Sequence, residues 1–282
     1  IKSSAASDVY KRQVLLQATY LLAAGNLYVV TYKIYPSGIV HVNAKFTSTD
    51  MQAAETEVSE ATRMATFTPG SDAARKAASK LEVPRIGVRF RLPAQMNNVQ
   101  YFGRGPEENY IDRNHGTMVG IYQTTADKMY FNYVRPQENG HHTDTRWLNL
   151  SPDKGNGLVI VADSLIGFNA LRNSVEDFDS EEALPHPYQW NNFSPEEAAN
   201  HDEKAARNVL RRMHHVNDIT PRDFVEVCVD MKQQGVGGYD SWGARPEPFH
   251  QIPANREYNW GFTLVPVRSG SQATEAAKYD YR

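Results

Sequence analysis

The sequence predicts an all-β fold, a sandwich or a barrel. Short runs rich in β-branched and aromatic residues recur along the chain, turn residues separate them, and helical periodicity is scarce. Residues 27–35 and 39–46 form the clearest pair, because Pro36-Ser37-Gly38 between them predicts a turn and the second run alternates apolar and polar side chains. With 282 residues, the chain is long enough to bury a self-standing core.

The rest of the chain shows the same pattern of short strand-like runs and turns, with two exceptions. Residues 47–82 are rich in alanine and charge around Pro69-Gly70, which predicts a surface insertion with two short helices. Residues 202–214 place apolar side chains at i, i+4 and i+8 and predict a helix. Further strands are predicted at residues 86–92, 130–134, 146–150, 158–163, 224–230 and 259–267.

These elements divide the chain into three parts. Residues 1–26 are expected to be a linker or a cut end with a first strand at most. Residues 27–268 are expected to form a single β domain, and residues 269–282 a polar tail that frays. No internal repeat is visible.

Composition excludes several classes of protein. A net charge of -3 and the lack of a basic stripe argue against binding to nucleic acid. No apolar stretch approaches the roughly 20 residues that span a bilayer. The single cysteine, Cys228, rules out an internal disulfide and lies in an apolar run, so we expect a small buried hydrophobe. A cytoplasmic location is the expectation, or a periplasmic one if the parent protein carries a signal peptide outside this chain.

Three glycine-containing polar segments carry the functional hypotheses. The first has the glycine spacing of a nucleotide loop, but a proline follows at once and no helix with an open N-terminus comes after it. A structural loop is favoured, with a polar rim to a sugar site as the alternative. The residues concerned are Gly103, Arg104, Gly105, Pro106, Glu108, Asn109, Tyr110, Asp112 and Arg113.

The second segment, residues 133–144, contains adjacent histidines. Adjacent residues on a strand point to opposite faces, and no cysteine is near. A closed zinc site at His141 and His142 is therefore disfavoured. Asn139 and His141 are instead expected to hydrogen-bond either to sugar hydroxyls or to loop backbone.

The third segment follows a strand with Gly235, Gly237 and Gly238, and these glycines let the backbone turn. Asp240, Ser241 and Trp242 come next. The indole of Trp242 has two possible roles from this pattern alone: stacking on the apolar face of a sugar, with Asp240 and Ser241 as polar partners, or plugging the end of the sandwich.

In order and spacing, the three segments resemble the C-terminal domain of the large bacterial β-galactosidases of glycoside hydrolase family 2, over residues 27–267. The resemblance implies a large antiparallel supersandwich of the galactose-mutarotase-like fold. It implies that the parent enzyme is a retaining β-galactosidase, and that the matching residue, Trp242, contacts the sugar.

The resemblance also implies what this chain lacks. The catalytic glutamates, together with the magnesium and sodium sites, would lie on a (β/α)8 barrel outside it, so we expect no catalytic residue and no cofactor here. The expected partners are a β-galactoside sugar and the barrel portion, or a separate large subunit if the chain is a small subunit. A stand-alone mutarotase or aldose epimerase and a carbohydrate-binding module are the alternatives from other classes.

Overall fold

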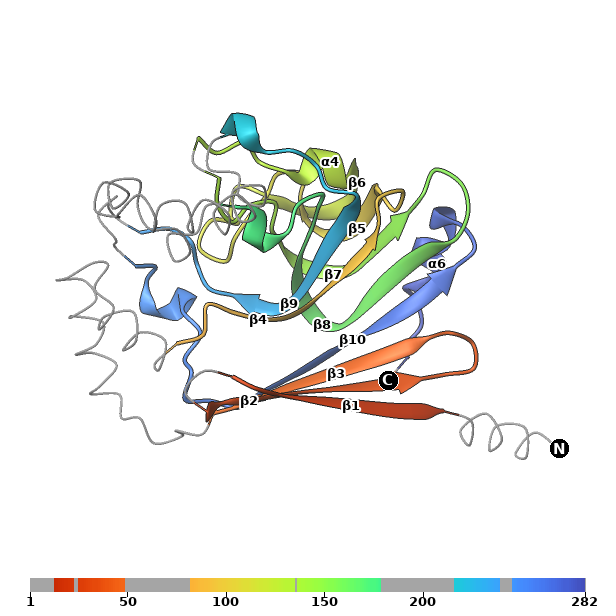
Figure 1. Ribbon diagram of the computed structural model, residues 1–282, viewed down its shortest axis with the longest axis horizontal. Helices are drawn as coiled ribbons and strands as arrows, with labels where there is room; N and C mark the ends of the chain where they lie inside the picture. Colours follow the sequence, from red (N-terminus) through yellow and green to blue (C-terminus); the bar gives the residue numbers. More distant parts are fainter. Residues whose placement is uncertain are drawn as a thin grey trace, which may run out of the picture.

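The computed structural model describes residues 13–22, 25–48, 82–134, 136–178, 216–238 and 245–281. A ten-stranded sheet with antiparallel pairing dominates the molecule (Figure 1), which confirms the predicted all-β sandwich. The strands are β1 (Val14–Leu21), β2 (Leu27–Ile34), β3 (Val40–Thr47), β4 (Arg85–Pro93), β5 (Asn98–Gly105), β6 (Met118–Thr125), β7 (His142–Ser151), β8 (Gly157–Leu171), β9 (Phe224–Gln233) and β10 (Tyr258–Val267).

The long strand β8 joins two leaves of this sheet. Its first part, from Gly157 to Ala162, pairs with β10, and its last part, from Gly167 to Leu171, pairs with β9. Strand β7 pairs with both halves and continues to β5 and β6. One leaf therefore runs from β10 through β3 and β2 to β1, and the other from β9 to β4 (Figure 1).

The main core fills the space between the leaves. Valines alternate with polar residues along β9, and Val225, Val227 and Val229 are fully buried. They belong to one apolar cluster that also contains Phe168 of β8 and Phe262 of β10. Cys228 is buried and free, as predicted, and burial raises the pKa of its thiol to about 12.

The short helices lie outside the sheet. The C-terminal segments η6 (Gly270–Gln272) and α6 (Ala273–Ala276) correct one prediction, because the tail does not fray. Ala273 is fully buried against Trp147 and Val265, in a second, smaller core on the other face of the sheet. The helical segments are α4 (Ala126–Met129), η2 (Val175–Asp177), η4 (Val216–Asp218), η5 (Pro248–His250), η6 (Gly270–Gln272) and α6 (Ala273–Ala276). In the part of the chain described, no helix is long and apolar enough to cross a membrane.

Other boundaries also differ from the prediction. Residues 130–134, expected as a strand, have no regular structure, whereas β5 and β6 were not predicted. The helix predicted at residues 202–214 lies outside the described residues, and so does the expected insertion except at its ends.

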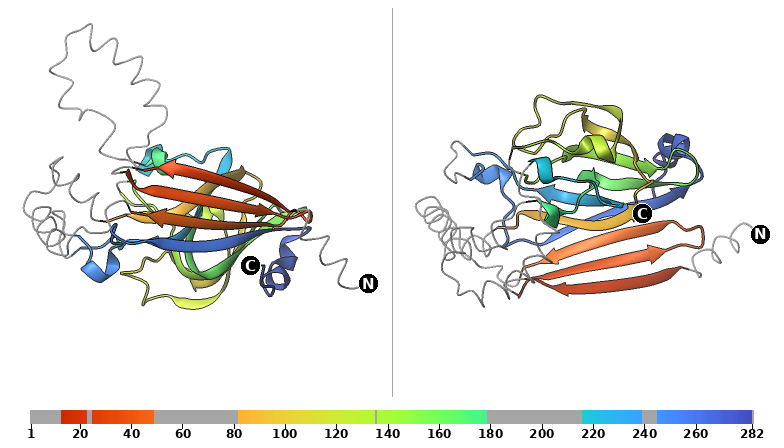
Figure 2. Two further views of the ribbon diagram at one scale, coloured as in Figure 1. Left: turned by 90° about the horizontal axis from the view of Figure 1, so that it is seen from below. Right: turned by 45° about the horizontal axis from the view of Figure 1, so that its top comes forward.

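Strand β1 forms an apolar edge. It pairs with β2 along its whole length and with no other described strand. Leu15, Leu16 and Leu21 are 65%, 55% and 76% exposed, although Leu16 shares a face with Tyr32, which packs on the main core. Figure 2 shows β1, β2 and β3 side by side as the outer part of their leaf.

Candidate functional site

The first of the three segments begins as a strand and ends as a loop. Strand β5 ends at Gly105, and Asn109, fully buried, holds the loop that follows. Its amide nitrogen donates to the carbonyls of Arg104 and Glu107, each at 3.1 Å. Its amide oxygen accepts from the backbone N–H of Thr143 at 2.9 Å and from its hydroxyl at 2.6 Å. One side chain therefore joins the loop to the start of β7.

Glu108 joins the first segment to the second. One carboxylate oxygen accepts a hydrogen bond from the backbone N–H of Gly140 at 2.6 Å, and the other accepts from Arg113 and from the Tyr133 hydroxyl. Gly140 has a φ of +72°, and a Cβ there would lie 2.7 Å from the carbonyl oxygen of Met129. The turn therefore requires glycine both for its backbone angle and for the space.

Asp112 joins the first segment to the third. Its carboxylate accepts a hydrogen bond from the backbone N–H of Gly237 at 2.7 Å. A Cβ on Gly235 would lie 2.5 Å from the same carboxylate oxygen, so only glycine lets the backbone approach so closely. The three segments predicted from the sequence therefore meet at one end of the sandwich. We call residues 106–113, 136–141 and 234–238 the motif loops.

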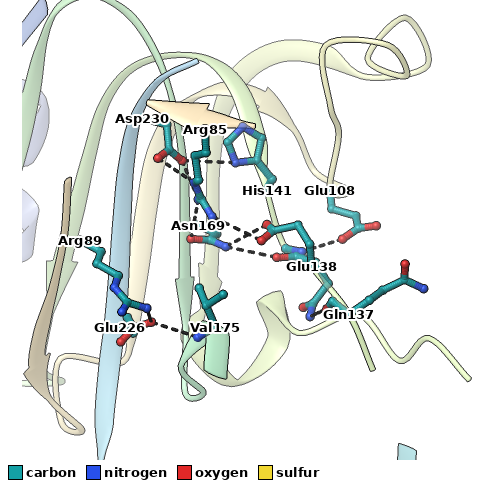
Figure 3. Close-up of polar contacts among 12 residues, drawn as sticks. Arg85, Arg89, Glu108, Gln137, Glu138, His141, Asn169, Val175, Glu226 and Asp230 are labelled. Atoms are coloured by element: carbon teal, nitrogen blue, oxygen red, sulfur yellow. Dashed lines mark hydrogen bonds and ion pairs between the residues drawn. The ribbon is translucent and has the colours of Figure 1, made fainter. Parts of the chain in front are cut away.

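A buried polar cluster lies beneath the motif loops (Figure 3). Arg85 of β4 donates two hydrogen bonds to the carboxylate of Asp230 on β9, at 2.8 and 2.6 Å. The same guanidinium lies 3.3 Å from the Glu138 carboxylate and 3.4 Å from the Asn169 amide oxygen. Because Glu138 belongs to the motif loops, this cluster fixes them to β4, β8 and β9.

Burial sets the charge states in this region. Burial by itself would lower the pKa of Arg85, but the Asp230 carboxylate raises it well above its ordinary value. Burial raises the pKa of Asp230 and of Glu138, and Arg85 opposes both shifts. Burial lowers the pKa of His141 well below its ordinary value and that of His142 to about 4. Both histidines are therefore neutral at neutral pH.

The two histidines pack as aromatic rings. His141 stacks on Tyr110 with ring centroids 5.4 Å apart, and His142 stacks on Tyr101 at 4.8 Å. Among the residues that the structure describes, no group of three or more potential metal ligands comes together. The pair thus contributes to packing beneath the loops.

The expectation that Asn139 and His141 contact a sugar is not supported by their positions, because each side chain is only 1% exposed. The Asn139 oxygen accepts from the backbone N–H of Phe131 at 3.1 Å, and its nitrogen donates to the carbonyl of Gln137 at 2.8 Å. This is the loop-backbone alternative. Nδ1 of His141 lies 3.7 Å from the Asp230 carboxylate.

Asp240, Ser241 and Trp242 lie outside the described residues, so their sugar-binding role stays a prediction. The described chain ends at Gly238 and resumes at Arg245. Asp112 therefore holds the backbone at Gly237, five residues before Trp242.

Sequence reasoning missed the roles of Arg85, Asp230 and Asn169. Two positions in the sequence indicated a buried ion pair: Asp230 follows the apolar residues of β9, and Arg85 is the first residue of β4. A charged residue in a strand that is otherwise buried needs a partner of opposite charge. Without the fold, nothing in the sequence pairs these two positions.

Comparison with known proteins shows the family of the chain. A family model described as "Beta galactosidase small chain" matches residues 2–264. The similar proteins include a Priestia megaterium β-galactosidase, 34% identical over 66% of this chain, and an Arthrobacter sp. β-galactosidase, 40% identical over 42% of it. A Streptococcus thermophilus β-galactosidase is 29% identical over 65%. These matches span only 12–15% of the relatives' own length.

Proposed function

Because the chain belongs to the β-galactosidase small-chain family, we propose that it supplies one wall of the galactoside pocket in a retaining β-galactosidase. Such an enzyme hydrolyses terminal β-D-galactosides, of which lactose is an example. A retaining glycosidase needs a nucleophile and an acid/base carboxyl about 5–5.5 Å apart. We place these carboxyls in the larger portion of the enzyme, since the matched region makes up 12–15% of its relatives.

The contact between Asp112 and Gly237 is the observation that carries this proposal. It joins the third segment, at Gly237, to the first segment, which is itself hydrogen-bonded to the second. The buried ion pair of Arg85 and Asp230 stiffens the strand that leads into the third segment. A site built on such a base holds its contacting side chains in place before the ligand arrives.

Trp242 would be the contacting side chain. An indole presents a flat apolar face, and galactose has an apolar C–H face of matching size. Stacking orients the sugar without a charged group and removes water from one side of it. The wall would therefore position the substrate, whereas the carboxyls of the other portion would carry out the chemistry.

A second form of the same function is a separately encoded small subunit. The description of the matching family as a small chain favours it. In that form the wall and the catalytic carboxyls belong to two polypeptides, and activity appears only on assembly.

Hydrolysis of nitrophenyl β-galactoside tests the proposal. The purified chain is assayed alone and after mixing with a fragment of a family β-galactosidase that lacks the C-terminal domain. We expect no activity from either part alone and activity from the mixture. Hydrolysis by the chain alone would overturn the placement of the catalytic carboxyls. If mixing gives no activity although both parts are folded and bound to each other, the proposal that this chain supplies one wall of the pocket is wrong.

Replacing Trp242 with alanine in the assembled enzyme is expected to lower kcat/KM about 30-fold, the effect of losing a buried aromatic contact of ~2 kcal/mol. Sugar binding weakens and transfer slows, because the stacked face orients the substrate. Trp242→Phe keeps a ring and should retain part of the activity. Unchanged kinetics in Trp242→Ala would contradict the role of this residue.

Replacing Asp112 with alanine is expected to raise KM about tenfold with a smaller effect on kcat. The substitution removes a charged hydrogen bond worth about 1.5–3 kcal/mol and frees the glycines that precede Trp242. Asp112→Asn keeps an acceptor oxygen and should restore part of the loss. Asp163→Ala is the matched control, since Asp163 is paired with His41 at 2.9 Å and is not part of the motif loops.

A further inference from the structure

A concave site lies at the opposite end of β5 from the motif loops. It is a cavity of about 420 Å³. Its floor is the outer face of β5, β6 and β7, and its walls are the turn between β7 and β8 and the segment after β10. Figure 1 shows α6 close to that turn. The lining residues, which we call the amide pocket, are Asn98, Val99, Gln100, Gln123, Thr124, Asn149, Ser151, Pro152, Asp153, Lys154, Gly155, Ser269, Gly270, Ser271 and Thr274.

The strand register places amide side chains in a row across the floor. Gln100 on β5 lies directly opposite Gln123 on β6 and Asn149 on β7. Asn98 lies opposite Ser151 in the next row of the same face. Neighbouring strands are about 4.8 Å apart, so each row presents several donors and acceptors within the width of a small molecule.

Much of this hydrogen-bonding capacity is unused. Within the described residues, the side chains of Gln100, Gln123 and Thr274 form no hydrogen bond with another group of the protein. The amide oxygen of Asn149 is also without a partner, although this side chain is only 2% exposed. A buried acceptor left unpaired costs about 1–3 kcal/mol, so a bound water is the expected partner of this oxygen, whereas Gln100 and Gln123 are the side chains open to a ligand.

The wall formed by the C-terminal segment is closely fitted. A Cβ on Gly270 would lie 2.7 Å from the Ser151 hydroxyl and 3.1 Å from the Asn149 amide nitrogen. The preceding Ser269 caps the turn by accepting a hydrogen bond from the backbone N–H of Ser271. The second core, which buries Ala273, holds this segment against the sheet, so the cavity persists without a ligand.

The lining chemistry selects the ligand. Amides and hydroxyls offer both donors and acceptors, which suits a hydroxyl because it does both. One lysine and one aspartate give no net charge, and Asp153 already accepts a hydrogen bond from Asn98 at 3.0 Å. Anions and apolar ligands would therefore leave most lining groups unpaired. The cavity volume falls within the range of about 300–1,000 Å³ typical of small-molecule sites.

We propose that the amide pocket binds a neutral polyhydroxylated molecule of monosaccharide size, with Gln100 and Gln123 hydrogen-bonding to its hydroxyls. Among the described residues no aromatic side chain lines the cavity, so we expect binding to be weak. The site is separate from the wall that contains Trp242 and does not depend on it. A molecule bound there is held near the enzyme and takes no part in the hydrolytic step.

Saturation-transfer NMR on the purified chain tests the proposal with methyl β-D-galactopyranoside, methyl α-D-glucopyranoside and myo-inositol as probes. We expect saturable binding of at least one probe. Binding should weaken at least fivefold in the Gln100→Ala, Gln123→Ala double variant, because two hydrogen-bonding groups are lost. Gln95→Ala, which changes an exposed glutamine outside the pocket, is the matched control.

Each outcome separates this site from the proposed wall. Binding that survives Trp242→Ala but not the double variant supports the amide pocket. Binding that the double variant leaves intact, or no saturable binding of any probe, overturns it. The double variant should also leave hydrolysis in the mixed assay unchanged, so failure of that assay would bear on the wall alone.

Discussion

Replacing Asp230 with alanine is expected to destabilise the domain by about 3–5 kcal/mol, the cost of leaving one charge of a buried pair without its partner. Asp230 is 1% exposed, and its two oxygens receive two hydrogen bonds from Arg85. The guanidinium of Arg85 would keep only Glu138 at 3.3 Å as an acidic partner. Chemical denaturation at neutral pH measures the loss as a lower midpoint.

The matched control for that substitution is Glu176→Ala. Glu176 also forms an ion pair, with Arg89, but its side chain is 60% exposed, and exposed pairs contribute about 0–1 kcal/mol. Replacing both members of the buried pair, as Arg85→Met with Asp230→Leu, should recover much of the stability, because no lone charge is left. Equal losses in Asp230→Ala and Glu176→Ala would refute a structural role for the buried cluster.

Acidification is expected to destabilise the domain between about pH 6.5 and pH 4 through its buried histidines. In the unfolded chain a histidine gains its proton near pH 6.5, whereas burial lowers the pKa of His142 in the folded state to about 4. The unfolded state therefore binds more protons in this window, and stability falls as pH falls. His142 contributes roughly 3 kcal/mol across the full window, and His141 acts in the same direction.

Two carboxyls of the polar cluster, Asp230 and Glu138, act in the opposite direction. The raised pKa values of Asp230 and Glu138 mean that the folded state gains their protons first, which stabilises it on acidification. A variant therefore isolates the histidine contribution. Between pH 7 and 5, His142→Gln should lose about 2 kcal/mol less than the natural chain, and His115→Gln, at an exposed site, is the control. Identical pH slopes for all three proteins would exclude His142 as a source.

Strands with an uninterrupted apolar pattern were predictable from the sequence. The run at residues 224–230 became β9 (Phe224–Gln233), and the run at residues 259–267 became β10 (Tyr258–Val267). Strand β5 was missed because Gly103 and Gly105 indicate a loop. In the sheet they serve close approach instead, since a Cβ on Gly103 would lie 2.5 Å from the Thr145 hydroxyl.

The false strand at residues 130–134 has the opposite cause. Tyr130, Phe131 and Tyr133 have high β propensity, but their side chains make ring contacts outside any sheet. Tyr130 stacks on Phe178, and the ring centroids of Phe131 and Tyr133 are 4.6 Å apart. The backbone N–H of Phe131 bonds to the Asn139 side chain rather than to a neighbouring strand. Tertiary contacts therefore override local preference.

The candidate site was predictable only as a set of segments. Glycines and polar residues marked the three loops, and their order indicated the family. The sequence could not show that Asp112 reaches Gly237 or that Arg85 reaches Asp230, because these partners are separated by 125 and 145 residues. For the same reason the sequence left open whether Asn139 and His141 bond to a sugar or to loop backbone, and both residues are buried.

Among the described strands, β1, β4 and β6 each pair on one side only, and β1 and β4 differ in the edge that they present to an approaching polypeptide. Strand β4 carries Arg89 and Arg91, which pair with Glu226, and charged side chains of this kind discourage edge-to-edge addition of a further strand. Strand β1 presents leucines and an open row of backbone groups over eight residues. Within the described part of the chain, an incoming strand therefore meets a template at β1 and a charged barrier at β4. The isolated domain would accordingly tend to self-associate through β1 as its concentration rises.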